Sequence, residues 1–301
     1  MKIQNIYKLL CLGLVLSLGA CETDVTKEVN IDTTPKLAVV SFISPQDTVL
    51  LVNLQKTQPA VGKAMSREEA RVPNATVQLS DGSQTFTLKY EPTPDVYRLS
   101  ASKLPVLPGK TYYLTVAAPD GYTVSGSCTV PRTEGVRITD ITVTNKALDF
   151  PGGPTSMEVF SFKWQDAAGQ PNYYRTLGGS RESQDPINPN GPPRIEPFYF
   201  SSWNDKNKNI YSDEKTDGGL FSSGEGGSQM PASQVPPKPY WLHATLAVTD
   251  QHYYRYHRSV YQQADTDGNP FAEPTLIYTN LQGGLGVFAA YNEVKGSKRV
   301  E

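Results

Sequence analysis

Short runs in which apolar and polar residues alternate recur between residues 36 and 132. In the run from 123 to 130, Val124, Cys128 and Val130 alternate with polar residues, the period of two that is typical of a half-buried strand. Turn pairs such as Asp81-Gly82 favour tight hairpins between the runs. No helical period occurs among them, so they predict an N-terminal immunoglobulin/fibronectin-like antiparallel β-sandwich at 36–132. The predicted strands are 37–43, 48–54, 75–79, 85–89, 111–117 and 123–130.

Two further features of this module bear on its chemistry. The stretch 58–73 is polar and charged, and we predict that it is an exposed loop. Cys128 lies on the apolar side of its strand and is interpreted as a small core residue. No histidine occurs in the module, so a Cys–His or Ser–His catalytic pair cannot form within it.

A second β-rich module is predicted for residues 133–296, followed by a polar tail at 297–301. Long stretches without a strand pattern, at 178–193 and 202–239, predict loops that either bind a ligand or move. The predicted strands of this module are 136–143, 157–164, 172–176, 196–201 and 239–248.

One helix is predicted at about residues 250–264. Asp250 is a suitable N-cap, and Tyr254, His257 and Tyr261 recur at helical spacing. An aromatic stripe of this kind favours a helix that packs against a sheet over a ligand platform.

The first twenty residues have the three parts of a bacterial export signal. A basic flank precedes an apolar run at 9–18, which at about 1.5 Å per residue is too short to cross about 30 Å of hydrocarbon. The run ends in Leu18-Gly19-Ala20-Cys21, which resembles the lipobox of bacterial lipoproteins. That resemblance implies cleavage before Cys21, whose thiol then carries diacylglycerol, with acyl chains such as palmitate.

Residues 1–20 are therefore predicted to be a lipoprotein signal peptide. The charged segment 21–35 is predicted to be a solvated tether acylated at Cys21. Glu22 directly after the cysteine favours the outer membrane, by resemblance to bacterial sorting rules. The alternative is an ordinary signal peptide cleaved nearby, with Cys21 incidental.

Composition narrows the class of protein. Of 301 residues, 38% are hydrophobic, 19% are charged, and Gly and Pro number 24 each, which excludes a coiled coil, a multi-span membrane protein and a disordered chain. A formal net charge of -2 argues against a nucleic-acid partner. If Cys11 leaves with the signal peptide and Cys21 is acylated, Cys128 is the one free thiol, so no internal disulfide is expected.

One loop spaces oxygen-bearing side chains as calcium loops do. Its candidate metal ligands are Asp205, Asn207, Asn209 and Asp213. The sixth and twelfth positions lack the Gly and Glu of an EF-hand, so a solvated loop is the preferred interpretation. The histidines also lack zinc-site spacing. We therefore expect neither a metal nor a cofactor.

Aromatic residues in or beside the long loops are the candidate ligand-binding residues. Trp203 has a polar neighbourhood and is the surface candidate, able to stack on a sugar or pack on a partner. Tyr240 and Trp241 fit burial in the core of the second module at least as well. Tyr211 and Phe221 belong to the same group.

Several segments together resemble a known family. They are Pro35-Lys36-Leu37-Ala38-Val39-Val40-Ser41-Phe42-Ile43, the stretch 73–82, the closing Gly268-Asn269-Pro270-Phe271-Ala272-Glu273-Pro274 and Gly283-Gly284-Leu285-Gly286. With the lipobox, they resemble the Bacteroidota outer-membrane lipoprotein family of domain of unknown function 4249. The resemblance implies an envelope lipoprotein of a family often found alongside TonB-dependent receptors, and it brings no established activity. The clustered glycines themselves suggest the start of a strand where backbone approaches backbone closely.

These observations predict a non-enzymatic lipoprotein on the periplasmic face or cell surface of the outer membrane. It would act in recognition or as an accessory to a TonB-dependent receptor in nutrient uptake. No catalytic motif is present, but acid pairs for glycoside hydrolysis need not be close in sequence. An envelope hydrolase and a direct glycan-binding protein therefore remain alternatives. Expected partners are the bilayer through acylated Cys21, such a receptor, and a glycan or peptide ligand.

Overall fold

The computed structural model describes residues 34–59, 63–150, 153–184, 188, 190–198, 209–231, 238–266 and 275–301. Cys21, Trp203, Asp205 and Asn207 lie outside these residues, so what was predicted for them stays a prediction. One compact unit comprises Lys36–Thr57 with Ser66–Glu301, and Met1–Pro35 with Gln58–Met65 forms another. All the strands and helices below belong to the first of these units.

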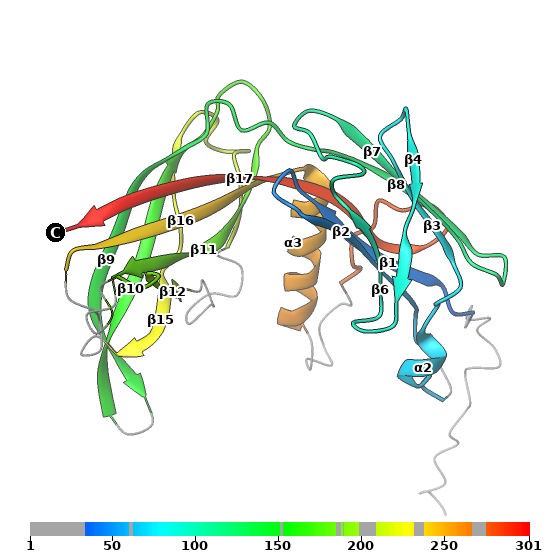
Figure 1. Cartoon of the computed structure of the whole chain (residues 1–301), viewed down its shortest axis with the longest axis horizontal. Helices are drawn as coiled ribbons and strands as arrows, with labels where there is room; N and C mark the ends of the chain where they lie inside the picture. Colours follow the sequence, from blue (N-terminus) through cyan, green and yellow to red (C-terminus); the bar gives the residue numbers. More distant parts are fainter. Residues whose placement is uncertain are drawn as a thin grey trace, which may run out of the picture. The chain divides into compact units, whose positions relative to one another are not determined.

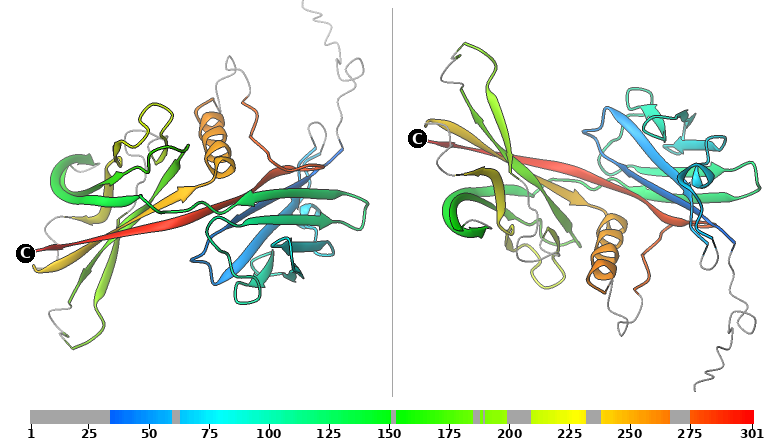
Figure 2. Two further views of the ribbon diagram at one scale, coloured as in Figure 1. Left: turned by 90° about the horizontal axis from the view of Figure 1, so that it is seen from above. Right: turned by 90° about the horizontal axis from the view of Figure 1, so that it is seen from below.

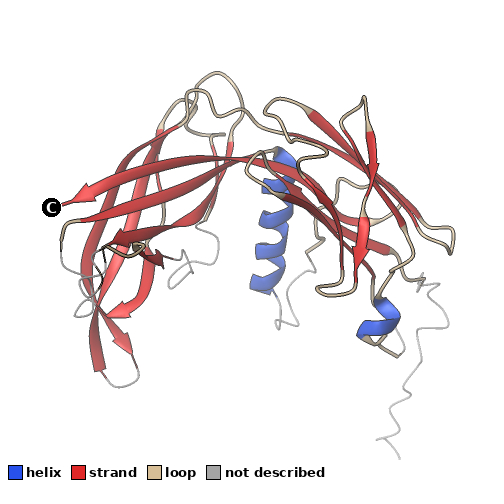
Figure 3. Ribbon diagram, viewed as in Figure 1, coloured by secondary structure: helices blue, strands red, loops and turns tan. Residues whose placement is uncertain are grey.

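Strands dominate the described residues, which confirms the prediction of a mainly β fold (Figure 3). The first half of the chain supplies eight strands (Figure 1). Their bounds are β1 Leu37–Ile43, β2 Val49–Lys56, β3 Thr76–Ser80, β4 Thr85–Thr87, β5 Lys89–Glu91, β6 Val96–Ser100, β7 Thr111–Ala117 and β8 Thr123–Thr129.

Nine more strands follow in the second half. β11 and the short strands β13 to β15 occupy parts of the stretches predicted as loops, so that prediction is wrong for those residues. The bounds are β9 Arg137–Phe150, β10 Gly153–Gln165, β11 Tyr173–Ser183, β12 Arg194–Phe198, β13 Ile210–Ser212, β14 Leu220–Ser222, β15 Gly226–Pro231, β16 Tyr240–Thr249 and β17 Leu285–Val300.

Two sheets in the first half enclose one hydrophobic core. One has the order β4-β3-β7-β8, and the other contains β1, β2, β6 and β5. Leu50, Val52 and Leu54 share the inward face of β2, as their alternation predicts. Cys128 of β8 is 2% exposed and belongs to the same core, which confirms its interpretation as a core residue.

β17 is shared between two strand ladders. From Leu285 to Ala290 it pairs in parallel with β1, and from Tyr291 to Val300 it pairs antiparallel with β16. The result is a nine-stranded sheet with the main order β12-β11-β16-β17-β1-β2-β6-β5, which Figure 2 shows from two sides. The sandwich of the first half therefore includes a strand from the end of the chain, in a parallel pair that its hairpins did not predict.

The glycines before and within β17 permit close backbone contact. An added Cβ on Gly286 would lie 2.0 Å from the carbonyl oxygen of Val39, and φ at Gly286 is +104°. Gly283 has φ +79°, and an added Cβ there would lie 2.2 Å from the carbonyl oxygen of Thr123. Residues with a side chain rarely adopt these angles, so the close approach inferred from the sequence is confirmed.

A second hydrophobic core lies in the second half, between the β9–β10 sheet and strands β11 and β16. Trp164 of β10 is fully buried at its centre. Phe221 stacks on the Trp164 ring at 5.5 Å between centroids, and Tyr211 meets it edge-on at 5.0 Å.

The stretch 58–73 contains a one-turn helix, so its prediction as an exposed loop is wrong in part. Helix α2, Arg67–Ala70, has Ser66 as N-cap, and Ser66 and Glu69 form a reciprocal capping box. Ala70 is buried, and Val72 belongs to the first core. A single turn is too short to show a helical period in the sequence.

Helix α3, Gln251–Thr266, lies where the aromatic repeat predicts a helix. Tyr253 and Tyr254 are buried, and Tyr253 packs with Val287 and Ala289 of β17. The stripe therefore contacts the sheet, as predicted. Neither α3 nor any other helix in the described part has the length and apolar character needed to span a membrane.

Candidate functional site

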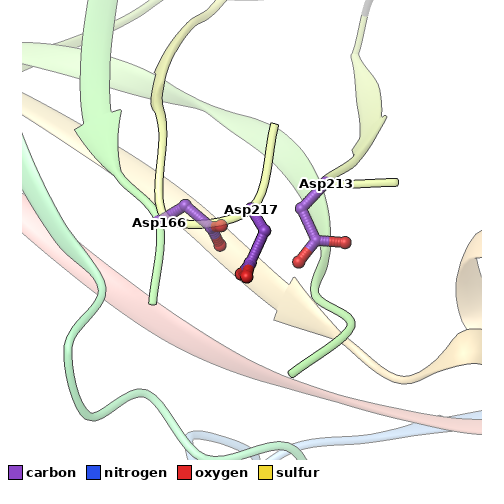
Figure 4. A group of neighbouring side chains, drawn as sticks. All are labelled: Asp166, Asp213 and Asp217. Atoms are coloured by element: carbon purple, nitrogen blue, oxygen red, sulfur yellow. The ribbon is translucent and has the colours of Figure 1, made fainter. Parts of the chain in front are cut away.

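Three aspartates converge where the loops around β13 meet the turn after β10 (Figure 4). Asp166 directly follows β10, Asp213 directly follows β13, and Asp217 precedes β14. One carboxylate oxygen from each lies within 4.8 Å of the others. Oxygen atoms so arranged are the ligands that hard divalent cations such as Ca²⁺ prefer.

Each of these carboxylates also holds a neighbouring loop. Asp166 accepts hydrogen bonds from the Tyr174 hydroxyl and from the backbone N–H of Gly218, the latter at 2.8 Å. Asp213 accepts from the N–H of Asn172 at 2.9 Å, and Asp217 from the N–H of Gly169 at 2.8 Å. The three carboxylates therefore join the β10–β11 turn to the loop between β13 and β14 by hydrogen bonds, an arrangement that we call the loop clamp.

The pKa of Asp213 reflects both its burial and the negative charges beside it. Desolvation raises the pKa of Asp213, and the charges of Asp166 and Asp217 raise it further, while the N–H of Asn172 opposes the change. Of the predicted metal candidates, Asp213 lies in this cluster. Asn209 directly precedes β13, and its side-chain oxygen is buried without a hydrogen-bond partner among the described residues. Sequence spacing could not reveal Asp166, because it comes from a different loop.

The aromatic candidates separate into buried and exposed residues. Tyr211 and Phe221 pack on Trp164. Tyr240 is 5% exposed and Trp241 is 44% exposed, because successive residues of β16 point to opposite faces of the sheet. Burial in the core is therefore correct for Tyr240 and wrong for Trp241.

Trp241 lies in a row of exposed and half-buried side chains across four strands. It pairs with Glu182 of β11 on one side and with Arg299 of β17 on the other. Glu182 pairs in turn with Ile195 of β12, which is 64% exposed. We call the exposed residues Ile195, Trp241 and Arg299, together with the half-buried Glu182 and His243, the Trp241 face.

Hydrogen bonds fix the polar part of the Trp241 face. His243 Nε2 lies 3.0 Å from Glu182 Oε2, and His243 Nδ1 lies 2.8 Å from the hydroxyl of Ser297. The imidazole is thus oriented beside the exposed indole by partners on both neighbouring strands. Such an arrangement offers a flat apolar ring flanked by oriented hydrogen-bonding groups.

The buried thiol offers no nucleophile. Burial raises the pKa of Cys128 well above its usual range, which keeps the thiol protonated and unreactive. His252 and His257 point to different partners: His252 lies 2.8 Å from the Tyr278 hydroxyl, and His257 lies 3.0 Å from Arg175 Nη1. The two histidines therefore share no ligand position.

A comparison with known families gives a match over most of the chain. The model of the family described as Domain of unknown function (DUF4249) matches residues 22–297. No curated protein matches the chain. The match covers nearly all of the chain that follows Cys21, including every strand and helix described above except the last residues of β17.

Proposed function

The chain belongs to the family of domain of unknown function 4249, and on that premise we propose that it is a non-enzymatic lipoprotein that acts in recognition at the outer membrane. Its partner in this proposal is a TonB-dependent receptor, to which it serves as an accessory. The family resemblance and the lipobox at Leu18-Gly19-Ala20-Cys21 support the location, since an acylated cysteine with a charged tether anchors a protein to a bilayer.

The Trp241 face is the observation that carries the recognition role. Trp and Arg are the residues most enriched where protein partners bind tightly, and here Trp241 and Arg299 lie side by side on an exposed face with Ile195. Polar neighbours surround these anchors, as in the rim of an interface.

Affinity purification of the full-length lipoprotein from native membranes tests this proposal. We expect a β-barrel receptor to copurify with the wild-type protein and with Tyr113→Ala, and to be lost with Trp241→Ala. Tyr113 is a matched control because it is an aromatic residue on a strand, 47% exposed, outside the Trp241 face. Recovery of the lipoprotein without any receptor would contradict the accessory role.

The anchor is tested separately. Cys21→Ala should leave the signal peptide unprocessed by the lipoprotein pathway and shift the protein out of the membrane fraction. Unchanged processing and fractionation would contradict the proposed location without bearing on the Trp241 face.

Direct glycan binding is the second candidate, and the orientation of His243 favours it. An exposed indole with Glu182 and His243 fixed beside it can stack on a sugar ring and bond its hydroxyls. Tryptophan fluorescence titrated with purified envelope oligosaccharides would show saturable quenching, lost in Trp241→Ala. Binding that survives Trp241→Ala but not Trp203→Ala would move the site to the residue predicted from the sequence.

A further inference from the structure

Arg175 of β11 is held in place beneath helix α3 by two neutral side chains. Its Nη1 donates to the hydroxyl of Tyr253 at 2.7 Å and lies 3.0 Å from His257 Nε2. The ring of His257 is itself fixed by stacking on Phe42 at 5.2 Å between centroids, with 20° between the planes. The guanidinium is therefore half-buried and oriented before any ligand arrives.

The positive charge of Arg175 has no acid partner in the described part of the chain. No carboxylate oxygen there lies within the 4.0 Å of an ion pair, and the N–H groups on Nε and Nη2 bond no described residue. Neither nitrogen is among the buried atoms that lack a partner, so both reach solvent. This edge of the guanidinium carries the parallel pair of N–H groups that can bind a carboxylate with two hydrogen bonds.

The other arginine of β11, Arg181, has its charge neutralised by acidic side chains. Arg181 is fully buried and forms ion pairs with both Glu158 and Glu196. A buried charge is costly without a partner, and the two glutamates neutralise Arg181 within the chain. Arg175 is on the same strand and lacks that compensation among the described residues.

The groups that face Arg175 from neighbouring elements do not neutralise it. Burial, with a smaller contribution from Arg175, lowers the pKa of His257 to about 3, so its imidazole is neutral at pH 7. Burial raises the pKa of Tyr253, which keeps its hydroxyl protonated. On β17, Glu293 is separated from Arg175 by Ala247 in the strand order and pairs with Lys295 at 3.0 Å.

We propose that Arg175, positioned by Tyr253 and His257, is the anchor of a binding site for a ligand that carries a carboxylate. The two outward N–H groups bind its two oxygens, and the aromatic side chains of α3 line one side. The carboxylate is supplied either by an acidic sugar or by the C-terminus of a peptide. The site is independent of the proposed receptor partner and stands whether or not a receptor copurifies.

The imidazole of His257 reports directly on this site. A bound carboxylate offsets the charge of Arg175, so the pKa of His257 should rise when the ligand binds. We would follow the His257 ring signals by NMR against pH, using the chain from residue 21 onward, and assign them with His257→Gln. The probes are glucuronate against glucose, and a short peptide with a free C-terminus against the same peptide amidated.

The expected result is a rise in the pKa of His257, and saturable binding, with at least one carboxylate probe and with neither of its uncharged analogues. The probe that acts identifies the source of the carboxylate. Arg175→Gln should weaken binding about tenfold or more, and Arg175→Lys should weaken it less, since the charge remains but the paired N–H geometry is lost. Arg255→Gln, which removes an exposed arginine of helix α3, should leave binding unchanged.

Two results would overturn the proposal. One is a His257 pKa that stays the same with every carboxylate probe, which needs only the wild-type protein and so does not depend on the stability of a variant. The other is a response to sulfate as large as the response to the carboxylates, which would show unspecific attraction of anions.

Discussion

The side chain of Asp250 accepts a hydrogen bond from the backbone N–H of Ala290 at 3.0 Å, and the N–H of Asp250 donates to the Ala290 carbonyl oxygen at 2.9 Å. Ala290 is the last residue of β17 that pairs with β1, and Tyr291 is the first that pairs with β16. Asp250 also caps α3 through the N–H of Tyr253. One residue therefore joins both ladders and the helix at the point where β17 changes partner.

The protonation of Asp250 should make stability depend on pH. Burial raises the pKa of Asp250 to about 7, against the opposing hydrogen bonds from Tyr253, Ala290 and His252. The folded state then binds more protons than the unfolded state between about pH 4 and pH 7, so this group's contribution is lost as pH rises through that window. We expect the wild-type unfolding free energy to fall there, by up to about 1.4 kcal/mol per pH unit from this residue.

Urea unfolding of wild type and Asp250→Asn at several pH values isolates this effect, because the other titrating groups are common to both. The unfolding free energy of wild type minus that of Asp250→Asn should decrease as pH rises from 4 to 7. A difference that does not vary with pH, or that grows, would show that Asp250 is ionised in the folded state.

Gly286→Ala should destabilise the protein by about 3 kcal/mol or more, because the new methyl group would meet the Val39 carbonyl oxygen at 2.0 Å with φ at +104°. Gly121→Ala is the matched control. Its φ is +88° but nothing lies within 4 Å of the added Cβ, so only the backbone cost of about 1–2 kcal/mol is expected. Equal losses in urea unfolding would mean that β17 and β1 are not in close contact.

Arg181→Met should cost about 3–5 kcal/mol, because it leaves Glu158 and Glu196 as buried carboxylates without their cation. Adding Glu158→Gln and Glu196→Gln to that variant should recover part of the loss, since the uncompensated charges are then gone. A triple variant less stable than Arg181→Met would show that the carboxylates do not depend on the arginine.

Asp166→Asn should destabilise the loop clamp by about 1–3 kcal/mol, because the buried carboxylate bonds both the Tyr174 hydroxyl and the Gly218 N–H. The exposed Asp217 bonds one N–H, so Asp217→Asn is expected to cost less than about 1 kcal/mol. Thermal unfolding of the two variants gives the comparison, and an equal effect would argue against the clamp.

Alternation along the chain predicted most strands, and the exceptions have physical causes. The runs at β1 and β7 matched to the residue because buried residues alternate with less buried ones along each strand. β14 and β15 were missed because their short, Gly- and Ser-containing segments have no alternation and become strands by pairing with β10. The change of partner in β17 depends on contacts with β1, far away in sequence, which no local pattern contains.

The candidate sites were less accessible to sequence reasoning than the fold. The exposure of Trp241 depends on which face of β16 meets the second core, and that is set by the register with β11 and β17. The environment of Arg175 depends on α3 lying over β11, which brings Tyr253 and His257 to it. The spacing of residues along the sequence predicts neither the exposure of Trp241 nor the contacts of Arg175.

The recognition role of the Trp241 face is tested most directly by a photo-crosslinking amino acid at position 241 in the acylated protein in native membranes. We expect one dominant covalent product with an outer-membrane β-barrel, identified by mass spectrometry, and none from the same amino acid at position 113. Absence of a product at position 241, or equal products at both positions, would contradict recognition through this face.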